Sequence, residues 1–145
     1  MYFVDREQIE GTLQFLNRQI ELFEMNETWE TPMERAALER IAHTMIESVL
    51  DVGNSMIDGF IMRDPGSYED IIDILLDEKV ITTEMSESLK KTVQFRKVLV
   101  QQYTAVDHLT LQKSFEAELS ELKLFSVRVL EYLTNELGPV SAFKK

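Results

Sequence analysis

The spacing of apolar residues is the feature that most constrains the fold of this chain. Between residues 5 and 25, apolar side chains recur at alternating steps of four and three, as on one face of an α-helix. That stripe consists of Ile9, Leu13, Leu16, Ile20 and Phe23. No segment alternates apolar and polar residues as a half-buried strand would. The sequence therefore predicts an all-α protein.

Signals for the second helix are concentrated at residues 31–34, Thr-Pro-Met-Glu. A Thr cap, a Pro in the first helical position and a Glu three residues after the Thr can close a capping box. The predicted helix continues to about Met62. Gly53 and Gly59 lower its intrinsic helix propensity, so we expect them to permit a close helix contact or a bend.

Three more helices are predicted after the turn at residues 63–67, whose Ser67 can act as a cap. A short helix covers Tyr68 to about Glu78, and a longer one starts at Thr82 or Thr83 and continues to about Thr104. Asp107 caps the last helix, which Gly138-Pro139 ends. The predicted architecture is one domain over residues 1–145, an up-down bundle of about four long helices plus a short helix.

Composition narrows the functional classes. The formal net charge of −11 argues against a general DNA or RNA binder, because phosphate contacts need clustered Lys and Arg. The chain has no cysteine, so disulfides, thiolate nucleophiles and cysteine metal sites are excluded. No apolar run approaches ~18 residues, and the first residues lack the pattern of a signal peptide. We therefore expect a cytoplasmic protein with no membrane contact.

The segment F-R-K-V-L-V-Q-Q-Y, residues 95–103, is unusual in this acidic chain. From Ser88 to Val106 there are four cations and no carboxylate. On a continuous helix Arg96 lies within an apolar stripe, and Gln101 lies about 140° around from it. Two copies packed across a two-fold axis would bring both to one cleft, so a homodimer is predicted. The cations form either a cleft for an anionic ligand or a face that docks on an acidic helix.

Three segments together resemble the HepT-like proteins of the HEPN group, in particular their YutE-like branch. They are I-E-S-V-L-D-V-G-N, D-P-G-S-Y and F-R-K-V-L-V-Q-Q-Y, in an order of elements that is similar over most of the chain. The resemblance implies a dimeric, HEPN-like helical toxin that cleaves RNA without a metal or another cofactor. It also implies a partner, an MntA-like nucleotidyltransferase antitoxin that silences the toxin by adding AMP to a tyrosine.

The family motif is Arg-x4-His-x-Tyr, and the chain matches it at two of three positions. Arg96 and Tyr103 match the arginine and the AMP-accepting tyrosine, but Gln101 stands at the histidine position. Lys97 stands where the family often has Asn. Arg96 can stabilise charge on a reacting phosphate, whereas a glutamine cannot act as an acid or base. Lys97 could donate a proton only if it were buried or surrounded by cations.

Supporting residues have two interpretations. Asp51 and Asn54 are three residues apart on the second helix; Asp51 could pair with Arg96 and Asn54 could hold a backbone or phosphate oxygen. Alternatively they make ordinary interhelical hydrogen bonds or face solvent. The two histidines, His43 and His108, are interpreted as ordinary exposed residues.

Glu39, His43 and Glu47 share four-residue spacing, which a metal could use, although ion pairs with Arg35 and Arg40 explain it as well. No metal site is predicted.

Two functions remain open at this point. One is a toxin RNase, or a form of it weakened by the loss of the histidine; the other is a non-catalytic helical dimer that acts as an adaptor or binds a partner or a nucleotide.

Overall fold

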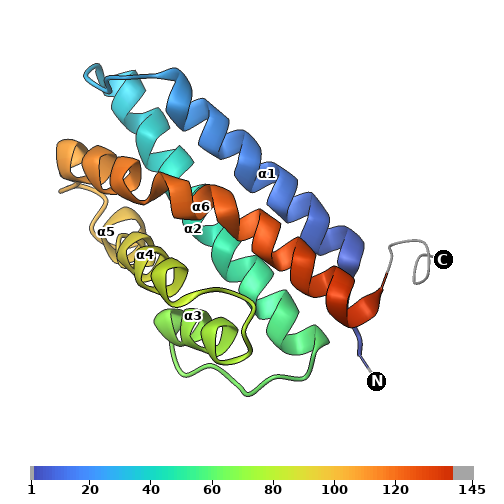
Figure 1. Ribbon diagram of the computed structural model, residues 1–145. Coiled ribbons are helices and arrows are strands. Elements are labelled where there is room, and N and C mark those ends of the chain that lie inside the picture. The colour runs from blue at the N-terminus through green and yellow to red at the C-terminus, as the bar shows by residue number, and fades with distance from the viewer. Residues whose placement is uncertain (1, 139–145) are drawn as a thin grey trace.

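The computed structural model describes residues 2–138, in which it contains six α-helices and no strand. The predicted all-α class is confirmed, and three of these helices are long (Figure 1). Their bounds are α1 Arg6–Met25, α2 Pro32–Gly59, α3 Tyr68–Asp77, α4 Thr83–Val93, α5 Arg96–Val100 and α6 His108–Leu137. No helix in this part of the chain is long and apolar enough to cross a bilayer.

The predicted helix starts are confirmed by their caps. At the start of α2 the Glu34 amide donates to Thr31 Oγ1 at 3.1 Å, and the Thr31 amide donates to Glu34 Oε1 at 3.0 Å. This is the reciprocal capping box expected from the sequence. A side-chain oxygen also accepts an amide hydrogen bond at four other helix starts, those capped by Asp5, Ser67, Thr82 and Asp107. Local sequence therefore determines where most helices begin.

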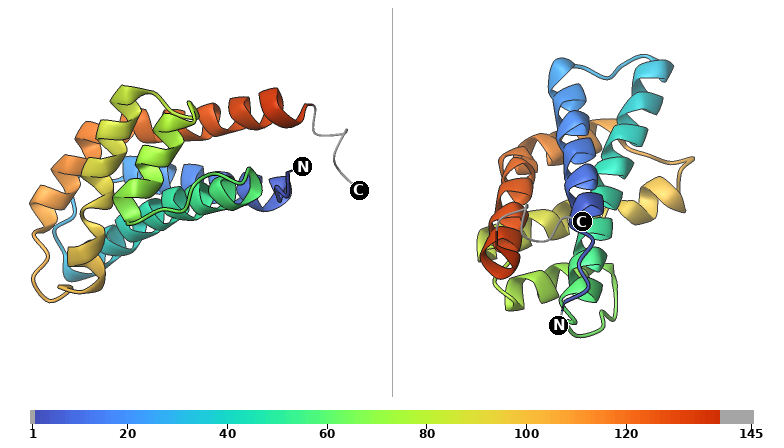
Figure 2. Two further views of the ribbon diagram at one scale, coloured as in Figure 1. Left: turned by 90° about the horizontal axis from the view of Figure 1, so that it is seen from below. Right: turned by 90° about the vertical axis from the view of Figure 1, so that its right-hand side faces the viewer.

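Apolar stripes on all the long helices meet in one core. Helix α1 packs along α2, and α6 lies against α1, α2 and α4, while α3 contacts both α2 and α4 (Figures 1 and 2). All five residues of the predicted α1 stripe are buried. The start of α1 and the end of α6 are tied together, because Arg6 Nη1 donates to the carbonyl of Gly138 at 3.0 Å. Gly138 caps α6 as predicted, and Pro139 lies outside the described residues.

Helix α2 ends at Gly59, three residues before the predicted end. The backbone leaves the helix because Ile61 adopts φ 56°, and the Met62 amide then bonds to the Ile57 carbonyl at 2.9 Å. The expected close helix contact is confirmed at Gly53, whereas Gly59 lies against Val4, which precedes α1. A Cβ at Gly53 would lie 2.4 Å from Ile71 Cγ2 on α3, and one at Gly59 would lie 2.8 Å from Val4 Cγ2.

The prediction of one helix from residue 82 or 83 to about 104 is wrong. Helix α4 ends at Val93 and α5 covers only residues 96–100. Between them the Phe95 amide bonds to the carbonyl of Thr92, three residues back rather than four. Such a tightened turn advances each residue by more than the ~100° of an α-helix, so side chains beyond Val93 point away from their predicted directions.

Residues 101–105 form turns instead of continuing the helix. Their side chains are all exposed, including Tyr103 at 66%. Without a buried face, this stretch has no packing to hold it helical, and most helical stability in proteins comes from such packing.

Candidate functional site

Arg96, the motif arginine, is held by two other helices. Its Nε and Nη2 donate to the two carboxylate oxygens of Glu47 on α2, at 3.2 and 3.0 Å. The ring of Tyr68, the first residue of α3, lies 4.3 Å from its guanidinium carbon. A forked contact with a carboxylate combined with stacking on an aromatic ring is a task that Arg performs and Lys does not. The guanidinium therefore has a fixed position, with its side chain 23% exposed.

His43 shares the carboxylate that holds Arg96. His43 Nε2 lies 3.1 Å from Glu47 Oε1, the same oxygen that accepts from Arg96 Nη2. Partial burial acts to raise the pKa of Glu47, but hydrogen bonds and charges from Arg96 and His43 outweigh it and lower the pKa below its ordinary value. Glu47 is therefore an ionised acceptor between a permanent cation and an imidazole.

Asp51 lies one turn further along α2 and does not pair with Arg96 by a hydrogen bond or ion pair. Glu47 takes the place predicted for Asp51, because Glu47 is the carboxylate of α2 that Arg96 on α5 reaches. Burial and the negative charge of Glu47 raise the pKa of Asp51, and the charge of Arg96 only partly offsets them. Asn54 is exposed, and its side chain has no hydrogen bond within residues 2–138, in agreement with a solvent-facing edge.

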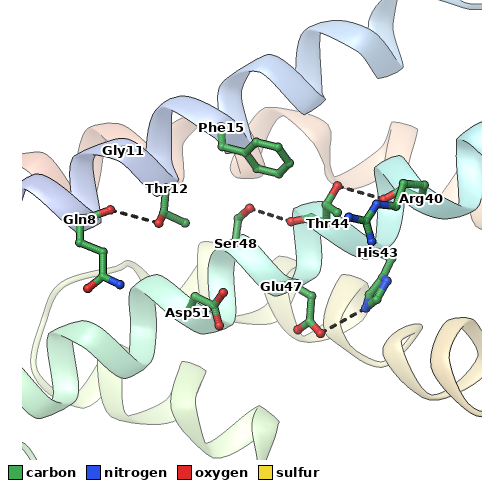
Figure 3. Close-up of a pocket in the computed structure, with 10 residues that line it drawn as sticks. All are labelled: Gln8, Gly11, Thr12, Phe15, Arg40, His43, Thr44, Glu47, Ser48 and Asp51. Atoms are coloured by element: carbon green, nitrogen blue, oxygen red, sulfur yellow. Dashed lines mark hydrogen bonds and ion pairs between the residues drawn. The ribbon is translucent and has the colours of Figure 1, made fainter.

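A groove of about 610 Å³ lies between α1 and α2, beside this carboxylate (Figure 3). Both helices contribute side chains to its wall, and His43, Glu47 and Asp51 are among them. The full lining is Gln8, Gly11, Thr12, Phe15, Arg40, His43, Thr44, Glu47, Ser48 and Asp51. The groove is open to solvent and carries groups of both charges.

The other predicted site residues of this segment do not contact Arg96 in the described part of the chain. Lys97, Gln101 and Tyr103 are exposed. In the described chain, none of these three side chains makes a hydrogen bond, ion pair or ring contact. The structure thus separates the anchored Arg96 from three predicted site residues that are open to solvent.

Two of the four cations of the segment dock on carboxylates of neighbouring helices. Lys90 forms an ion pair with Asp73 on α3, and Arg96 forms one with Glu47. This agrees with the interpretation of the segment as a cationic face that packs on an acidic helix. Lys91 and Lys97 remain exposed.

Neither histidine is the ordinary exposed residue that the sequence favoured. His43 pairs with Glu47, and His108 Nε2 at the start of α6 lies 2.6 Å from Glu39 Oε2. Both histidines are half-buried. No group of three or more His, Asp or Glu side chains in residues 2–138 is arranged to hold a metal ion.

Two partners of Arg96 are not predicted by the sequence. The spacing of four between His43 and Glu47 is the available signal for Glu47, but it indicates a metal ligand or a surface ion pair. Tyr68 is predicted only to start a short helix. Its role depends on α3 packing beside α5, which no local pattern encodes.

Comparison with known proteins identifies the class. The family model described as "Ribonuclease HepT-like" matches residues 7–129, so the chain belongs to the HepT-like ribonuclease family. The resemblance predicted from the sequence is confirmed.

Individual relatives agree with this assignment. A protein of Bacillus subtilis (strain 168) named "Putative RNase YutE" is 53% identical over 144 residues, which cover 99% of this chain and 100% of the relative. A solved structure described as "Structure of Cytosolic Protein of Unknown Function YutE from Bacillus subtilis" has a TM-score of 0.95 at 52% identity, covering 99% of this chain and 100% of that one.

A more distant structure shares the fold. It is described as "Crystal structure of the toxin-antitoxin with AMP-PNP", with a TM-score of 0.69 at 17% identity over 84% of this chain and 93% of that one. At this identity the similarity shows a common HEPN-like helical architecture.

Proposed function

We propose that this protein is a metal-independent endoribonuclease and the toxin of a HepT/MntA-type toxin–antitoxin pair. The observation that carries the proposal is the fixed Arg96, held on Glu47 and stacked on Tyr68, in a chain of the HepT-like ribonuclease family. A permanently charged donor with a fixed position can stabilise the charge that develops on a phosphate during cleavage.

Arg96 keeps free donor capacity for such a phosphate. Glu47 occupies Nε and one hydrogen of Nη2, whereas Nη1 makes no hydrogen bond within residues 2–138. A guanidinium has five N–H donors, so a phosphate oxygen can bind without displacing Glu47. The acidic charge of the whole chain favours a single local phosphate site over general nucleic-acid binding.

The exposed part of the motif supports the remaining elements of the proposal. Lys97 and Gln101 are open to solvent, so a second protomer can bring them to the Arg96 site of the first. Tyr103 is 66% exposed and its hydroxyl makes no hydrogen bond within residues 2–138, so it is accessible, as an acceptor of AMP from an MntA-like nucleotidyltransferase must be. The relative YutE is described as cytosolic, which supports a cytoplasmic location for this protein.

A second candidate is a non-catalytic helical dimer that acts as an adaptor or binds a nucleotide. Gln101 is the observation that favours it, since an amide cannot replace the acid–base group of the family motif. The two candidates share the fold and the dimer and differ in RNA cleavage.

Cleavage of single-stranded RNA by the purified protein in EDTA tests the proposal. Wild type, Arg96→Ala and Gln101→His are compared, with Arg63→Ala as the matched control. Arg63 also makes a forked contact with a carboxylate, Asp70 at 2.9 and 3.0 Å, but lies outside the site. The proposal expects cleavage by wild type and Arg63→Ala and its loss in Arg96→Ala.

The other outcomes favour the second candidate or refine the first. If wild type does not cleave RNA and Gln101→His does, the cleft persists but has lost its acid–base group. If neither wild type nor any variant cleaves RNA, an RNase function is contradicted and the non-catalytic adaptor is supported.

A further inference from the structure

We propose that His43 supplies the acid–base chemistry of this ribonuclease, as the base that takes the proton of the attacking 2′-hydroxyl. This inference rests on the proposed function and names the group that performs its proton transfer. The family motif has Gln101 at its histidine position, so the proton must move through a residue outside the motif. The chain has two histidines, and only His43 touches the carboxylate that holds Arg96.

The geometry connects His43 directly to Arg96. His43 Nε2 and Arg96 Nη2 both approach Glu47 Oε1, at 3.1 and 3.0 Å. One oxygen atom therefore separates the imidazole from the guanidinium. The inference requires a phosphodiester on Arg96 to extend past Glu47, so that its neighbouring 2′-hydroxyl reaches Nδ1 on the other side of the imidazole ring.

Glu47 also determines which imidazole nitrogen is basic. An ionised carboxylate can only accept hydrogen bonds, so its contact with His43 requires the hydrogen on Nε2. Nδ1 then carries the lone pair, and it makes no hydrogen bond within the described residues. A carboxylate that fixes the tautomer of a histidine base is a recurrent arrangement in hydrolytic sites.

The groove between α1 and α2 gives RNA access to His43. Its volume of about 610 Å³ is within the range of small-molecule sites, ~300–1,000 Å³. Phe15 is 37% exposed in its wall and offers an aromatic face on which a base can stack. One turn before Phe15 on the same helix, Gly11 leaves open space, because a Cβ there would meet nothing within 4 Å. Figure 3 shows Phe15 and His43 on opposite helices of this groove.

The charges around His43 come from two helices. On α2 they are Glu39, Arg40 and Glu47, one turn away in either direction, and Arg96 on α5 lies across Glu47. Helix α1 lines the groove with Gln8, Gly11, Thr12 and Phe15, none of which titrates. Two carboxylates and two permanent cations therefore flank the imidazole of His43.

The reaction balances without a further reactant except water. The 2′-oxygen attacks the phosphorus as His43 Nδ1 takes its proton, and Arg96 holds a non-bridging oxygen. The bond from phosphorus to the 5′-oxygen breaks, and that oxygen takes a proton from solvent water. The products are a 2′,3′-cyclic phosphate and a 5′-hydroxyl, and His43 returns its proton to solvent.

His108 provides a matched control for this assignment. Its pair with Glu39 resembles the His43 pair, with side-chain exposures of 20% and 30% against 27% and 30%. Within residues 2–138, no arginine forms a hydrogen bond or ion pair with the Glu39 carboxylate. Replacing His108 thus tests the loss of a half-buried histidine–glutamate pair without touching the Arg96 site.

The experiment measures cleavage of a single-stranded RNA oligonucleotide in EDTA from pH 5 to 9 by wild type, His43→Gln and His108→Gln. The expected rate of wild type rises through neutral pH and then levels. His43→Gln is expected to lose at least about 100-fold and to lose that rise, since general acid–base catalysis contributes roughly 10²–10⁴-fold. His108→Gln is expected to keep both the rate and the profile.

A structural effect is separated from a chemical one by adding imidazole to His43→Gly, which should restore cleavage only if the missing group is the base. A His43→Gln variant that keeps the rise of rate with pH overturns the inference while leaving the ribonuclease function intact. An inactive wild type overturns the proposed function and this inference together. Loss of the rise in His108→Gln instead of His43→Gln assigns the base to the other pair and also overturns the inference.

Discussion

Arg96 and Tyr103 are seven residues apart in one motif, yet they differ in how other side chains hold them and in their exposure to solvent. Arg96 is fixed by Glu47 on α2 and by Tyr68 on α3. Tyr103 is 66% exposed and makes no side-chain contact of these kinds within residues 2–138. The fold thus holds the Arg96 guanidinium in a fixed position and leaves the tyrosine accessible to other molecules. Proximity in sequence does not make the two residues parts of one preformed site.

The largest effect on stability is expected from disturbing the contact between α2 and α3. This contact matters for the site because α3 begins with Tyr68, which stacks on Arg96. Gly53→Ala would place a Cβ 2.4 Å from Ile71 Cγ2, so the helices must separate. We expect a loss of about 1–3 kcal/mol in the free energy of unfolding, as for overpacked cores. Chemical denaturation measures it.

Gly11→Ala is the control, because a Cβ at Gly11 meets nothing within 4 Å. In an open helical position the same substitution should stabilise by about 0.5–1 kcal/mol, since alanine loses less conformational entropy than glycine. Equal effects of the two substitutions would contradict the close α2–α3 contact.

The second largest effect concerns the anchor of Arg96. Glu47→Ala leaves the half-buried guanidinium without its carboxylate, and we expect a loss of about 1–2 kcal/mol after allowing for its partial exposure. A double-mutant cycle with Arg96→Ala measures the coupling. A coupling energy near zero would show that Arg96 is as free as Tyr103 and remove the contrast between them.

A smaller effect is expected from Asp51, whose contribution to stability depends on pH in the opposite way to that of Glu47. Glu47 has a lowered pKa in the folded state, so its stabilisation is present above its ordinary pKa and is lost as pH falls through the lowered value. Asp51 has a raised pKa, so its contribution is favourable at acid pH and is lost as pH rises through the raised value. Asp51→Asn should therefore stabilise at pH 7, by less than about 0.5 kcal/mol.

Thermal unfolding of Asp51→Asn at pH 7 and at pH 3 checks the sign. The stabilisation should shrink at pH 3, where the wild-type carboxyl is largely protonated in both states. A gain that is the same at both pH values would mean that charge on Asp51 is not its cause.

The smallest effect is expected at the exposed end of the motif. Tyr103→Phe removes a hydroxyl that no described residue binds, so the free energy of unfolding should change by less than about 0.5 kcal/mol. Denaturation at pH 7 measures this. A larger loss would show that Tyr103 is held by contacts like those of Arg96.

The sequence predicts most of the bundle because its helices start at local signals. Thr31 with Glu34, Ser67 and Asp107 cap the helices at which they were expected. The interruption at Gln94 and Phe95 is not predicted, because no proline or glycine marks it and the apolar spacing continues across it. The Phe95 amide bonds to the carbonyl of Thr92, three residues back, and no compositional signal announces this change.

The site was less predictable than the fold, since its contacts join distant segments. Glu47 and Arg96 are separated by 49 positions. Asp51 and Glu47 are both acidic and one turn apart on α2, so spacing alone could not choose between them as the partner of Arg96. Only the packing of α5 against α2 makes that choice.

The interruption after Val93 affects which segments of the chain unfold locally. Helix α4 contributes six buried residues, whereas α5 contributes only Leu99. Segments with few buried contacts unfold locally at a lower free energy than the core. Amide hydrogens of residues 101–105 should therefore exchange with deuterium far faster than those in the middle of α4, although the two stretches are almost adjacent in the chain. The stretch that carries Tyr103 would be a separate unit of local unfolding, open to a modifying enzyme while the core remains closed.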